Sequence, residues 1–300
     1  MTLYLRDDLA EMWKGRDPFL AAAEQTGEIF REREGRRTLR FGSKDCGDSP
    51  LNHLSGGLAA SDSDASYFLK YHGGIGWGEI LKNLSQAKWP IIGAMSEVHA
   101  IRAVEAAGVD TLTIVGYGER GADPAKQQSF LVTEDLVGTV SLEELGEKWR
   151  NTPGSIRFKR ALIRRAAEMA KAMHDAGVNH RDFYLGHFLI AQQDVELENV
   201  DASIFLIDLH RSQVRGRVPR RWRVKDIGGL YFSTARFGLT RRDLFRFMQV
   251  YTGMALRDAL GDKAALLMAS RREGEKIYRR YFEKEPHFPL QFSEHPGKDI

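Results

Sequence analysis

The stretch His180-Arg181-Asp182 decides how this sequence is interpreted. It directly follows a segment whose apolar residues recur at intervals of four, three, four and three up to Gly177, which predicts a long helix. Asp182 is therefore expected on a loop held by a rigid element, where a catalytic carboxylate belongs. Taken alone, the tripeptide is weak evidence, because an Arg–Asp pair that closes a helix end is the more ordinary explanation.

Three further residues lie on elements that give them chemical meaning. Asp208 ends an apolar run, Ile204-Phe205-Leu206-Ile207, and a strand that ends in an acid can present a carboxylate to a metal ion. Lys70 lies within the predicted strand Tyr67–Tyr71, where lysine is unfavourable unless its ammonium group meets a partner. Glu97, in the first turn of the next predicted helix, is the expected partner.

The order of these residues along the chain is typical of a kinase-like phosphotransferase. Phosphoryl transfer needs charge stabilisation and alignment, so we expect Lys70 to hold the phosphates of ATP and Asp208 to bind Mg²⁺. Asp182 then accepts the proton of the acceptor hydroxyl, and His180 and Arg181 are further candidate catalytic residues of the same loop. His187 stands five residues after Asp182, where protein kinases have a metal-binding asparagine. Imidazole is a softer ligand than Mg²⁺ prefers, which leaves the metal role of His187 open.

Periodicity divides the chain into a β-rich first part and a helical second part, an α+β arrangement with two lobes and a ligand cleft. We expect an N-terminal helical extension over 1–26, an N-lobe over 27–136 and a helical C-lobe over 137–300. Helical segments of the C-lobe are predicted near 226–236, 240–251 and 255–283. The N-lobe strands are predicted at Glu28–Arg33, Arg37–Phe41, Tyr67–Tyr71, Leu112–Tyr117 and Ser129–Thr133. One helix is predicted at Ser96–Gly108, with Ser96 as its N-cap and Gly108 at its end. Glu134 lies in the link between the lobes and is a candidate for nucleotide binding.

Residues 42–66 interrupt the N-lobe pattern, because Ser, Gly and Asp supply 14 of their 25 positions. We interpret them as a mobile insertion. The hairpin that precedes them has Gly35 at its tip but no glycine-rich nucleotide loop, which is a departure from protein kinases.

Composition excludes several classes of protein. With 42% hydrophobic and 28% charged residues, the chain has a globular composition, and no run approaches the length of a membrane span. A single cysteine permits no internal disulfide, and the histidines show no zinc-binding spacing, so we expect a reducing, cytoplasmic location without a secretory signal. A net charge of +3 does not by itself indicate nucleic acid as a partner.

The clearest charge feature is a run of cations with no acid between them, which begins three residues after Asp208. Such a run is ordinarily a solvated surface, but its position beside the catalytic residues predicts an anionic acceptor rather than nucleic acid. Arginine suits the bidentate recognition of carboxylate or phosphate. The members of this run are Arg211, Arg215, Arg217, Arg220, Arg221, Arg223 and Lys225.

Several of these stretches together resemble the lipopolysaccharide core heptose(I) kinases of Gram-negative bacteria. The resemblance rests on Asn179–Tyr184 with His187-Phe188-Leu189, on Leu206–Arg211, on Arg220–Arg223 with Lys225-Asp226, and on Gly35–Phe41. It covers nearly the whole chain from Gly27 to about Thr252, and a histidine at position 187 is usual in that family. Two departures remain: Gly186 stands where the family has cysteine, and the insertion 42–66 is longer.

The resemblance implies a protein-kinase-like two-lobe fold and an enzyme that uses ATP and Mg²⁺. The implied reaction is phosphorylation of O-4 of the first heptose of the inner core of lipopolysaccharide, at the cytoplasmic face of the inner membrane. It further implies that the anionic membrane face and acyl carrier protein are partners. Other kinase-fold enzymes, namely Kdo kinases, small-molecule kinases and protein kinases, share the catalytic layout and remain alternatives. A catalytically silent, kinase-shaped binding module is an alternative from another class.

Overall fold

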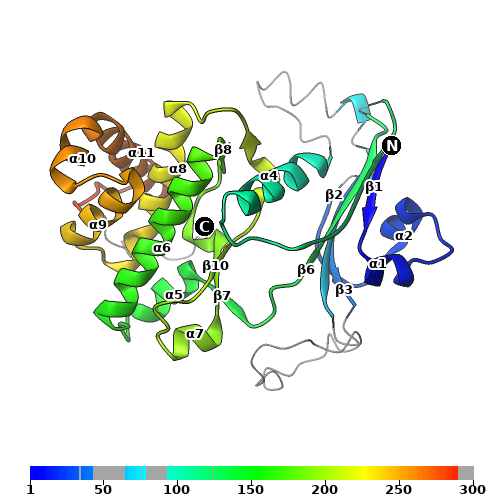
Figure 1. The fold of residues 1–300 in the computed structure, drawn as a ribbon, viewed down its shortest axis with the longest axis horizontal. Helices are drawn as coiled ribbons and strands as arrows, with labels where there is room; N and C mark the ends of the chain where they lie inside the picture. Colours follow the sequence, from blue (N-terminus) through cyan, green and yellow to red (C-terminus); the bar gives the residue numbers. More distant parts are fainter. Residues whose placement is uncertain (34, 43–64, 75, 79–92, 124, 290–300) are drawn as a thin grey trace. The chain divides into compact units, whose positions relative to one another are not determined.

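The computed structural model describes residues 1–33, 35–42, 65–74, 76–78, 93–123 and 125–289 (Figure 1). The predicted insertion 42–66 thus lies almost wholly outside the described residues. Contacts divide the chain into two compact units, Met1–His99 with Leu112–Val137 and Ala100–Thr111 with Gly138–Ile300, called unit 1 and unit 2 below. None of the helices that the structure describes combines the length and hydropathy required to span a membrane.

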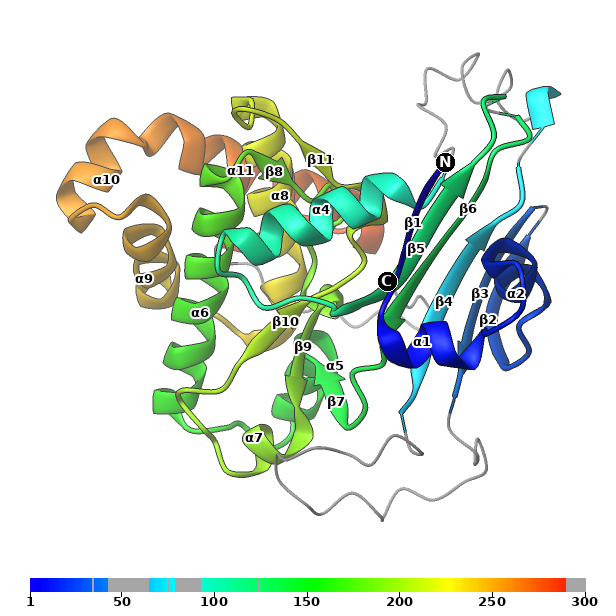
Figure 2. The ribbon, with the colours of Figure 1, turned by 45° about the vertical axis from the view of Figure 1, so that its right-hand side comes forward.

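Unit 1 is built on a six-stranded antiparallel sheet in the order β1-β5-β6-β4-β3-β2 (Figure 2). Its strands are β1 (Thr2–Leu5), β2 (Glu28–Arg33), β3 (Arg36–Phe41), β4 (Tyr67–His72), β5 (Ile114–Arg120) and β6 (Gln128–Glu134). The five predicted strands are all present. Lys70 lies in the inner strand β4, opposite Thr38 of β3 and Leu131 of β6.

Two short helices cover one face of this sheet, α1 (Asp7–Met12) and α2 (Pro18–Glu24) (Figure 2). Leu9, Trp13 and Phe19 are buried there against β-strand residues such as Phe130, whose ring meets those of Trp13 and Phe19 edge-on. The prediction for residues 1–26 was incomplete, because the chain begins with strand β1 and contains a second helix after Asp17. Asp17 caps α2 by accepting hydrogen bonds from the backbone of its first turn, and Pro18 suits that turn because it has no N–H to satisfy.

Helix α4 (Met95–Ala106) begins one residue before Ser96, so Ser96 is inside the helix and does not cap it as predicted. Gly108 follows it with a φ of +75°, the left-handed conformation that ends many helices. Glu97 lies in its first turn, and its side chain is only 3% exposed.

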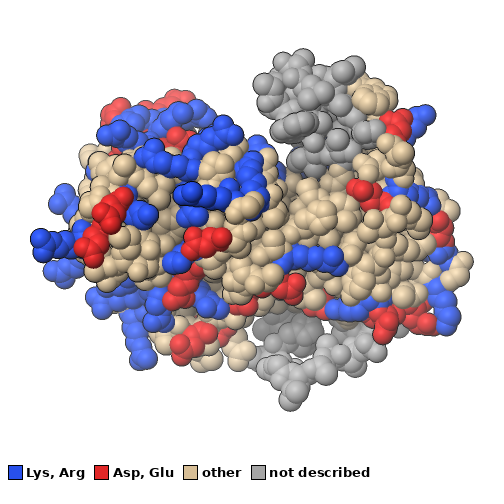
Figure 3. All heavy atoms as spheres, turned by 45° about the horizontal axis from the view of Figure 1, so that its top comes forward, with Lys and Arg blue, Asp and Glu red and all other residues tan. Residues whose placement is uncertain are grey.

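Unit 2 is mainly helical, as predicted. Its helices are α5 (Leu142–Trp149), α6 (Ile156–Asp175), α7 (Gln192–Glu196), α8 (Arg220–Ser233), α9 (Arg241–Thr252), α10 (Leu256–Asp262) and α11 (Ala264–Phe282). Helix α8 begins six residues earlier than the predicted 226, and the predicted helix 255–283 is divided at Lys263. Figure 3 shows lysine and arginine side chains gathered on one part of this unit's surface.

Short strands and single 3₁₀ turns connect the helices of unit 2. They are β7 (Thr139–Ser141), β8 (Val178–Asn179), β9 (Phe188–Ala191), β10 (Ile204–Leu206), β11 (Gln213–Val214), η1 (Leu185–His187), η2 (Leu209–Arg211) and η3 (Thr234–Phe237). Strand β9 lies between β10 and β7, and β8 pairs with β11. Gly177 makes the second pairing possible, because a Cβ atom there would lie 1.8 Å from the carbonyl oxygen of Arg215. The loop that follows β8 contains His180, Arg181 and Asp182.

Candidate active site

Unit 1 contains an ion pair between strand β4 and helix α4. Lys70 Nζ lies 2.6 Å from Glu97 Oε1, which confirms the pairing predicted from the sequence. The lysine side chain is 25% exposed and the glutamate 3%, so the pair has a buried end and an accessible end. A lysine held in this way keeps its ammonium charge and a fixed position, as the binding of a phosphate requires.

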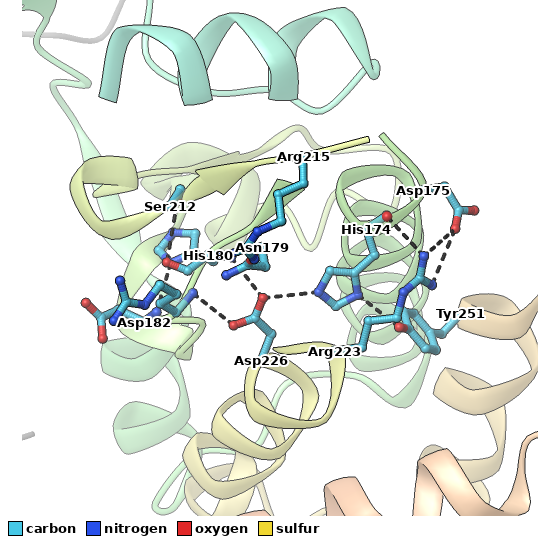
Figure 4. Close-up of polar contacts among 11 residues, drawn as sticks. His174, Asp175, Asn179, His180, Asp182, Ser212, Arg215, Arg223, Asp226 and Tyr251 are labelled. Atoms are coloured by element: carbon cyan, nitrogen blue, oxygen red, sulfur yellow. Dashed lines mark hydrogen bonds and ion pairs between the residues drawn. The ribbon is translucent and has the colours of Figure 1, made fainter. Parts of the chain in front are cut away.

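In unit 2, the loop after β8 is held from below by Asp226, in the second turn of α8 (Figure 4). Its carboxylate accepts hydrogen bonds from the backbone N–H groups of His180, at 2.8 Å, and Arg181, at 2.9 Å. Asp226 is only 1% exposed, and these charge-assisted bonds compensate for its burial. The loop is therefore attached to the helical core immediately before Asp182.

The carboxylate of Asp226 also belongs to a buried row of polar contacts with His174 and Tyr251 (Figure 4). His174 of α6 lies with Nε2 3.1 Å from Asp226 and Nδ1 2.9 Å from the hydroxyl of Tyr251 in α9. Burial raises the pKa of Tyr251 to about 12, so its hydroxyl stays protonated. Asp226 belongs to a stretch that carries the family resemblance, but the sequence analysis gave it no role, and it did not name His174.

His180 is buried with both ring nitrogens engaged. Nε2 donates to the carbonyl oxygen of Ile207, 3.0 Å away, and Nδ1 accepts from the backbone N–H of Asp182. Burial, helped by the neighbouring His187, lowers the pKa of His180 to about 4, which agrees with a neutral ring. The ring is 0% exposed, so we place His180 among the positioning residues instead of the catalytic residues expected from the sequence.

Asp182 is the accessible carboxylate of this loop, with a side chain that is 18% exposed. Nη1 of Arg211 lies 2.8 and 3.0 Å from its two carboxylate oxygens and fixes its orientation. Arg181, just before it, has a φ of +75°, which is uncommon for a residue with a side chain. Such strain often marks functional sites, and here it sends two successive side chains in different directions.

Asp208 follows β10 and also has left-handed backbone angles, φ 60° and ψ 50°. His210 Nδ1 lies 2.6 Å from one of its carboxylate oxygens, and His187 Nε2 lies 3.6 Å from the other. His187 donates from Nδ1 to the carbonyl oxygen of Asp182, 2.7 Å away, so in a neutral ring Nε2 carries a lone pair. Two acceptors then face each other, an arrangement that suits a cation between them.

These donors fit Mg²⁺ only in part. Among the residues that the structure describes, no three His, Cys, Asp or Glu side chains form a group that could hold a metal ion alone. This is acceptable for Mg²⁺, which usually binds through one or two carboxylates together with substrate phosphates. Asp208 supplies the oxygen ligand that Mg²⁺ prefers, and His187 supplies a softer nitrogen.

Comparison with known proteins identifies the family. Residues 21–251 match the model of the lipopolysaccharide kinase (Kdo/WaaP) family. The lipopolysaccharide core heptose(I) kinase WaaP of Pseudomonas aeruginosa is 47% identical over 280 residues, which is 93% of this chain and 97% of that protein. The chain belongs to the lipopolysaccharide kinase family.

Two further relatives agree with this assignment. WaaP of Escherichia coli K12 is 45% identical over 92% of this chain and 97% of its own length. A solved structure described as WaaP in complex with acyl carrier protein has a TM-score of 0.74 and 42% identity, and covers 93% of this chain and all of that one. As a member of this family, the chain has a kinase-like fold and is an ATP-dependent sugar kinase, which confirms both predictions.

The structure separates the basic run that the sequence presents as one group. Arg211 is bound to Asp182, Arg220 donates to the carbonyl oxygen of Ala265 at 2.8 Å, and Arg223 donates to that of His174 at 3.0 Å. These three arginines form intramolecular contacts, whereas the sequence predicted that they contact the acceptor. Arg215, Arg217, Arg221 and Lys225 form no ion pair with a carboxylate within the described part of the chain.

Two other expectations concern single residues. Glu134, predicted to bind nucleotide, forms an ion pair with Arg6 in unit 1 at 2.5 Å. Gly186 lies in η1, where a Cβ atom would come within 2.7 Å of Glu143 Oε2, the far end of a flexible side chain. A cysteine there, as expected from the resemblance, would need only a shift of that glutamate.

Proposed function

We propose that the chain transfers the γ-phosphate of ATP to O-4 of the first heptose of the lipopolysaccharide inner core. The observation that carries this proposal is the identity of 43–47% to three heptose(I) kinases, each matched over nearly its whole length. We place the enzyme in the cytoplasm, at the anionic face of the inner membrane, because the proposed acceptor is a membrane glycolipid.

In the proposed mechanism, Asp182 is the catalytic base. Its accessible carboxylate accepts the proton of the sugar hydroxyl as the oxygen attacks phosphorus. Arg211 fixes the plane of that carboxylate, and Asp226 fixes the backbone from which it projects. Phosphoryl transfer depends mainly on alignment, so these contacts carry much of the protein's contribution.

Lys70, held by Glu97, is proposed to bind the phosphates of ATP. Asp208 would hold Mg²⁺, with His187 beside it as a second ligand. When bound, the ion would supply positive charge that offsets the charge of the transferred phosphoryl group. His180 fixes the position of Asp182 relative to Ile207, because its two ring nitrogens form hydrogen bonds to the backbone of both residues.

Replacement of Asp182 by Asn tests the mechanism. The amide is nearly the same size but accepts no proton, so kcat should fall about 10²- to 10⁴-fold while ATP still binds. Asp201→Asn, at an exposed position before β10, is the matched control and should keep normal kcat. Near-normal turnover of Asp182→Asn would refute the assignment of the base.

The choice of acceptor distinguishes the proposal from the Kdo kinase alternative. Purified protein is offered ATP with one acceptor that ends in Kdo and another that carries the first heptose, and new phosphate is located by mass spectrometry. Phosphate at O-4 of heptose supports the proposal. Phosphate on Kdo, or on both acceptors equally, would replace it.

We also propose acyl carrier protein as a partner, because the solved relative is described as a complex with it. Unit 2 contains an apolar cavity of about 210 Å³ among α6, α8, α9, α10 and α11. Leu162, Leu230, Leu244 and Met248 are among its lining residues, and Lys159 and Arg271 are its charged ones. A cavity of about 150 Å³ already holds benzene, so this one has room for part of an acyl chain.

A cavity-filling substitution tests this partner. Met248→Trp should weaken binding of acyl carrier protein that bears a long acyl chain and should leave binding of the unacylated form unchanged. A melting measurement checks that the variant still folds. Equal binding of both forms by the wild-type protein would contradict the role of the cavity.

A further inference from the structure

Four cations surround a single indole ring in unit 2. Trp222 lies in the first turn of α8, and the charged groups of Lys225, Arg181, Arg221 and Arg215 lie 5.0, 5.1, 5.3 and 5.8 Å from its ring centre. We call these four side chains with Trp222 the Trp222 cluster. They come from the loop after β8, the segment after β11 and two turns of α8.

The positive charge of this cluster has no carboxylate in direct contact with it: across the described ranges, none of its four cations forms an ion pair. The carboxylates of Asp182 and Asp226 act on Arg181 only through longer-range attraction. Arg215 donates to the side-chain oxygens of Asn179 and Gln213, which are neutral. Burial, together with the nearby charges of Arg211 and Arg215, lowers the pKa of Arg181. Four like charges around one ring repel one another, and a bound anion would relieve that repulsion.

The indole holds these cations where they are and adds a donor. Attraction of a cation to the face of tryptophan is the strongest among aromatic side chains and offsets part of the mutual repulsion. Trp222 Nε1 is buried and has no hydrogen-bond acceptor among the residues that the structure describes. The cluster thus presents several donors and no acceptor, which favours a carboxylate or a phosphate as its ligand.

The cluster adjoins the proposed catalytic base. Arg181 precedes Asp182 in the chain, and its backbone N–H is bound to Asp226, which also lies in α8. The left-handed backbone of Arg181 allows its side chain to reach Trp222 while the next carboxylate is held by Arg211. A ligand on the cluster and a hydroxyl at Asp182 can therefore belong to one molecule.

We propose that Arg181, Arg215, Arg221 and Lys225, arranged around Trp222, form a subsite for an anionic group of the acceptor sugar chain. The inference rests on the proposed function and specifies its acceptor: the sugar that receives phosphate is linked to a carboxylate- or phosphate-bearing neighbour. It adds Arg181, which lies outside the basic run, to the residues that recognise the acceptor, and it removes Arg220 and Arg223 from them.

The test uses the full-length protein and two soluble acceptors without acyl chains, one that retains its anionic substituents and one neutral heptoside. Arg221→Gln/Lys225→Gln should raise KM for the anionic acceptor about fivefold, with little change in KM for ATP or for the neutral acceptor. Trp222→Leu should raise the same KM, and Trp222→Phe, which keeps an aromatic face, should restore part of the loss. Arg257→Gln, an exposed cation in α10, controls for the loss of charge.

Salt provides a second readout. KM for the anionic acceptor should rise with ionic strength in the wild-type protein and rise less in the double variant. Equal effects of the substitutions on anionic and neutral acceptors, or none on either, would overturn the subsite. An effect seen only with anionic vesicles, and not with the soluble acceptor, would overturn it in favour of membrane attachment.

Direct titration of the anionic oligosaccharide separates this inference from the proposed function. If no acceptor is phosphorylated but the oligosaccharide still binds in a Trp222-dependent manner, the proposed function fails and the subsite stands. If phosphate is transferred and binding does not depend on the cluster, the function stands and the subsite fails. Melting temperatures of all variants confirm that each is folded.

Discussion

Asp226→Asn provides the sharpest test of how the catalytic loop is held. The native carboxylate is bound by the N–H groups of His180 and Arg181 and lies 3.1 Å from Nε2 of His174. An asparagine has one acceptor oxygen, and its best orientation keeps that oxygen toward His180 and His174. Its NH₂ group then faces the N–H of Arg181, which is left without an acceptor. One lost charge-assisted bond and one unsatisfied donor should together cost about 2–4 kcal/mol of unfolding free energy.

A loss of that size leaves a protein of ordinary stability folded, so the catalytic effect can be measured. The backbone before Asp182 is then fixed less firmly, and a displacement near 1 Å can cost about 10²-fold in rate. We expect kcat to fall at least about tenfold while KM for ATP changes little. The measurements are denaturant unfolding and steady-state kinetics at a temperature well below the melting transition.

Asp175→Asn is the control, because that carboxylate lies beside the same region but is about half exposed and pairs with the side chains of Lys171 and Arg223. It should cost less than about 1 kcal/mol and leave kcat unchanged. An Asp226→Asn protein with reduced stability and normal kcat would show that the anchor serves folding alone. Normal stability would refute the hydrogen-bond accounting itself.

Three further predictions follow from named contacts. Lys70→Met should raise KM for ATP about tenfold or more, and it should lower the melting temperature because Glu97 is left buried without its partner. Adding Glu97→Gln to this variant should restore stability but not ATP binding. Recovery of both would contradict the proposed binding of phosphate by Lys70. The pKa of His180 is lowered by burial to about 4 in the folded chain, against 6.5 for the free side chain. Between pH 6.5 and 4, the unfolded chain therefore binds a proton at His180 and the folded chain does not. The unfolding free energy of the wild-type protein should therefore fall by about 3 kcal/mol from this group as pH drops from 6.5 to 4. Denaturant unfolding of His180→Gln should lack this contribution. If the unfolding free energies of both proteins change with pH in parallel, the prediction is refuted. Gly186→Ala should change the unfolding free energy by less than about 1 kcal/mol and leave kcat unchanged, because only the side chain of Glu143 must move. A large decrease in melting temperature would show that this glutamate is fixed.

The sequence predicted the strands that lead to Lys70 and Asp208 well, because each combines a local pattern with one unusual residue. Lys70 stands out in an apolar strand, and Asp208 ends another, so alternation and a misplaced charge were enough to locate them. The N-terminal segment was predicted less completely for a physical reason. Strand β1 has only four residues and is defined by its pairing with β5, more than one hundred residues away in the chain, which no local pattern reports.

The basic run shows where pattern reading fails at the site. Predicting α8 from residue 226 left Arg220 to Lys225 as an irregular segment, in which all cations seemed equally available. In the structure they lie on a helix that begins at Arg220, and residues one turn apart share a face. Arg221 and Lys225 are four residues apart and both reach Trp222, whereas Arg220 and Arg223 are turned toward backbone carbonyls of α11 and α6. Helical periodicity alone would have separated the two pairs, but the partners that distinguish binding from structural arginines come from distant segments and required the fold.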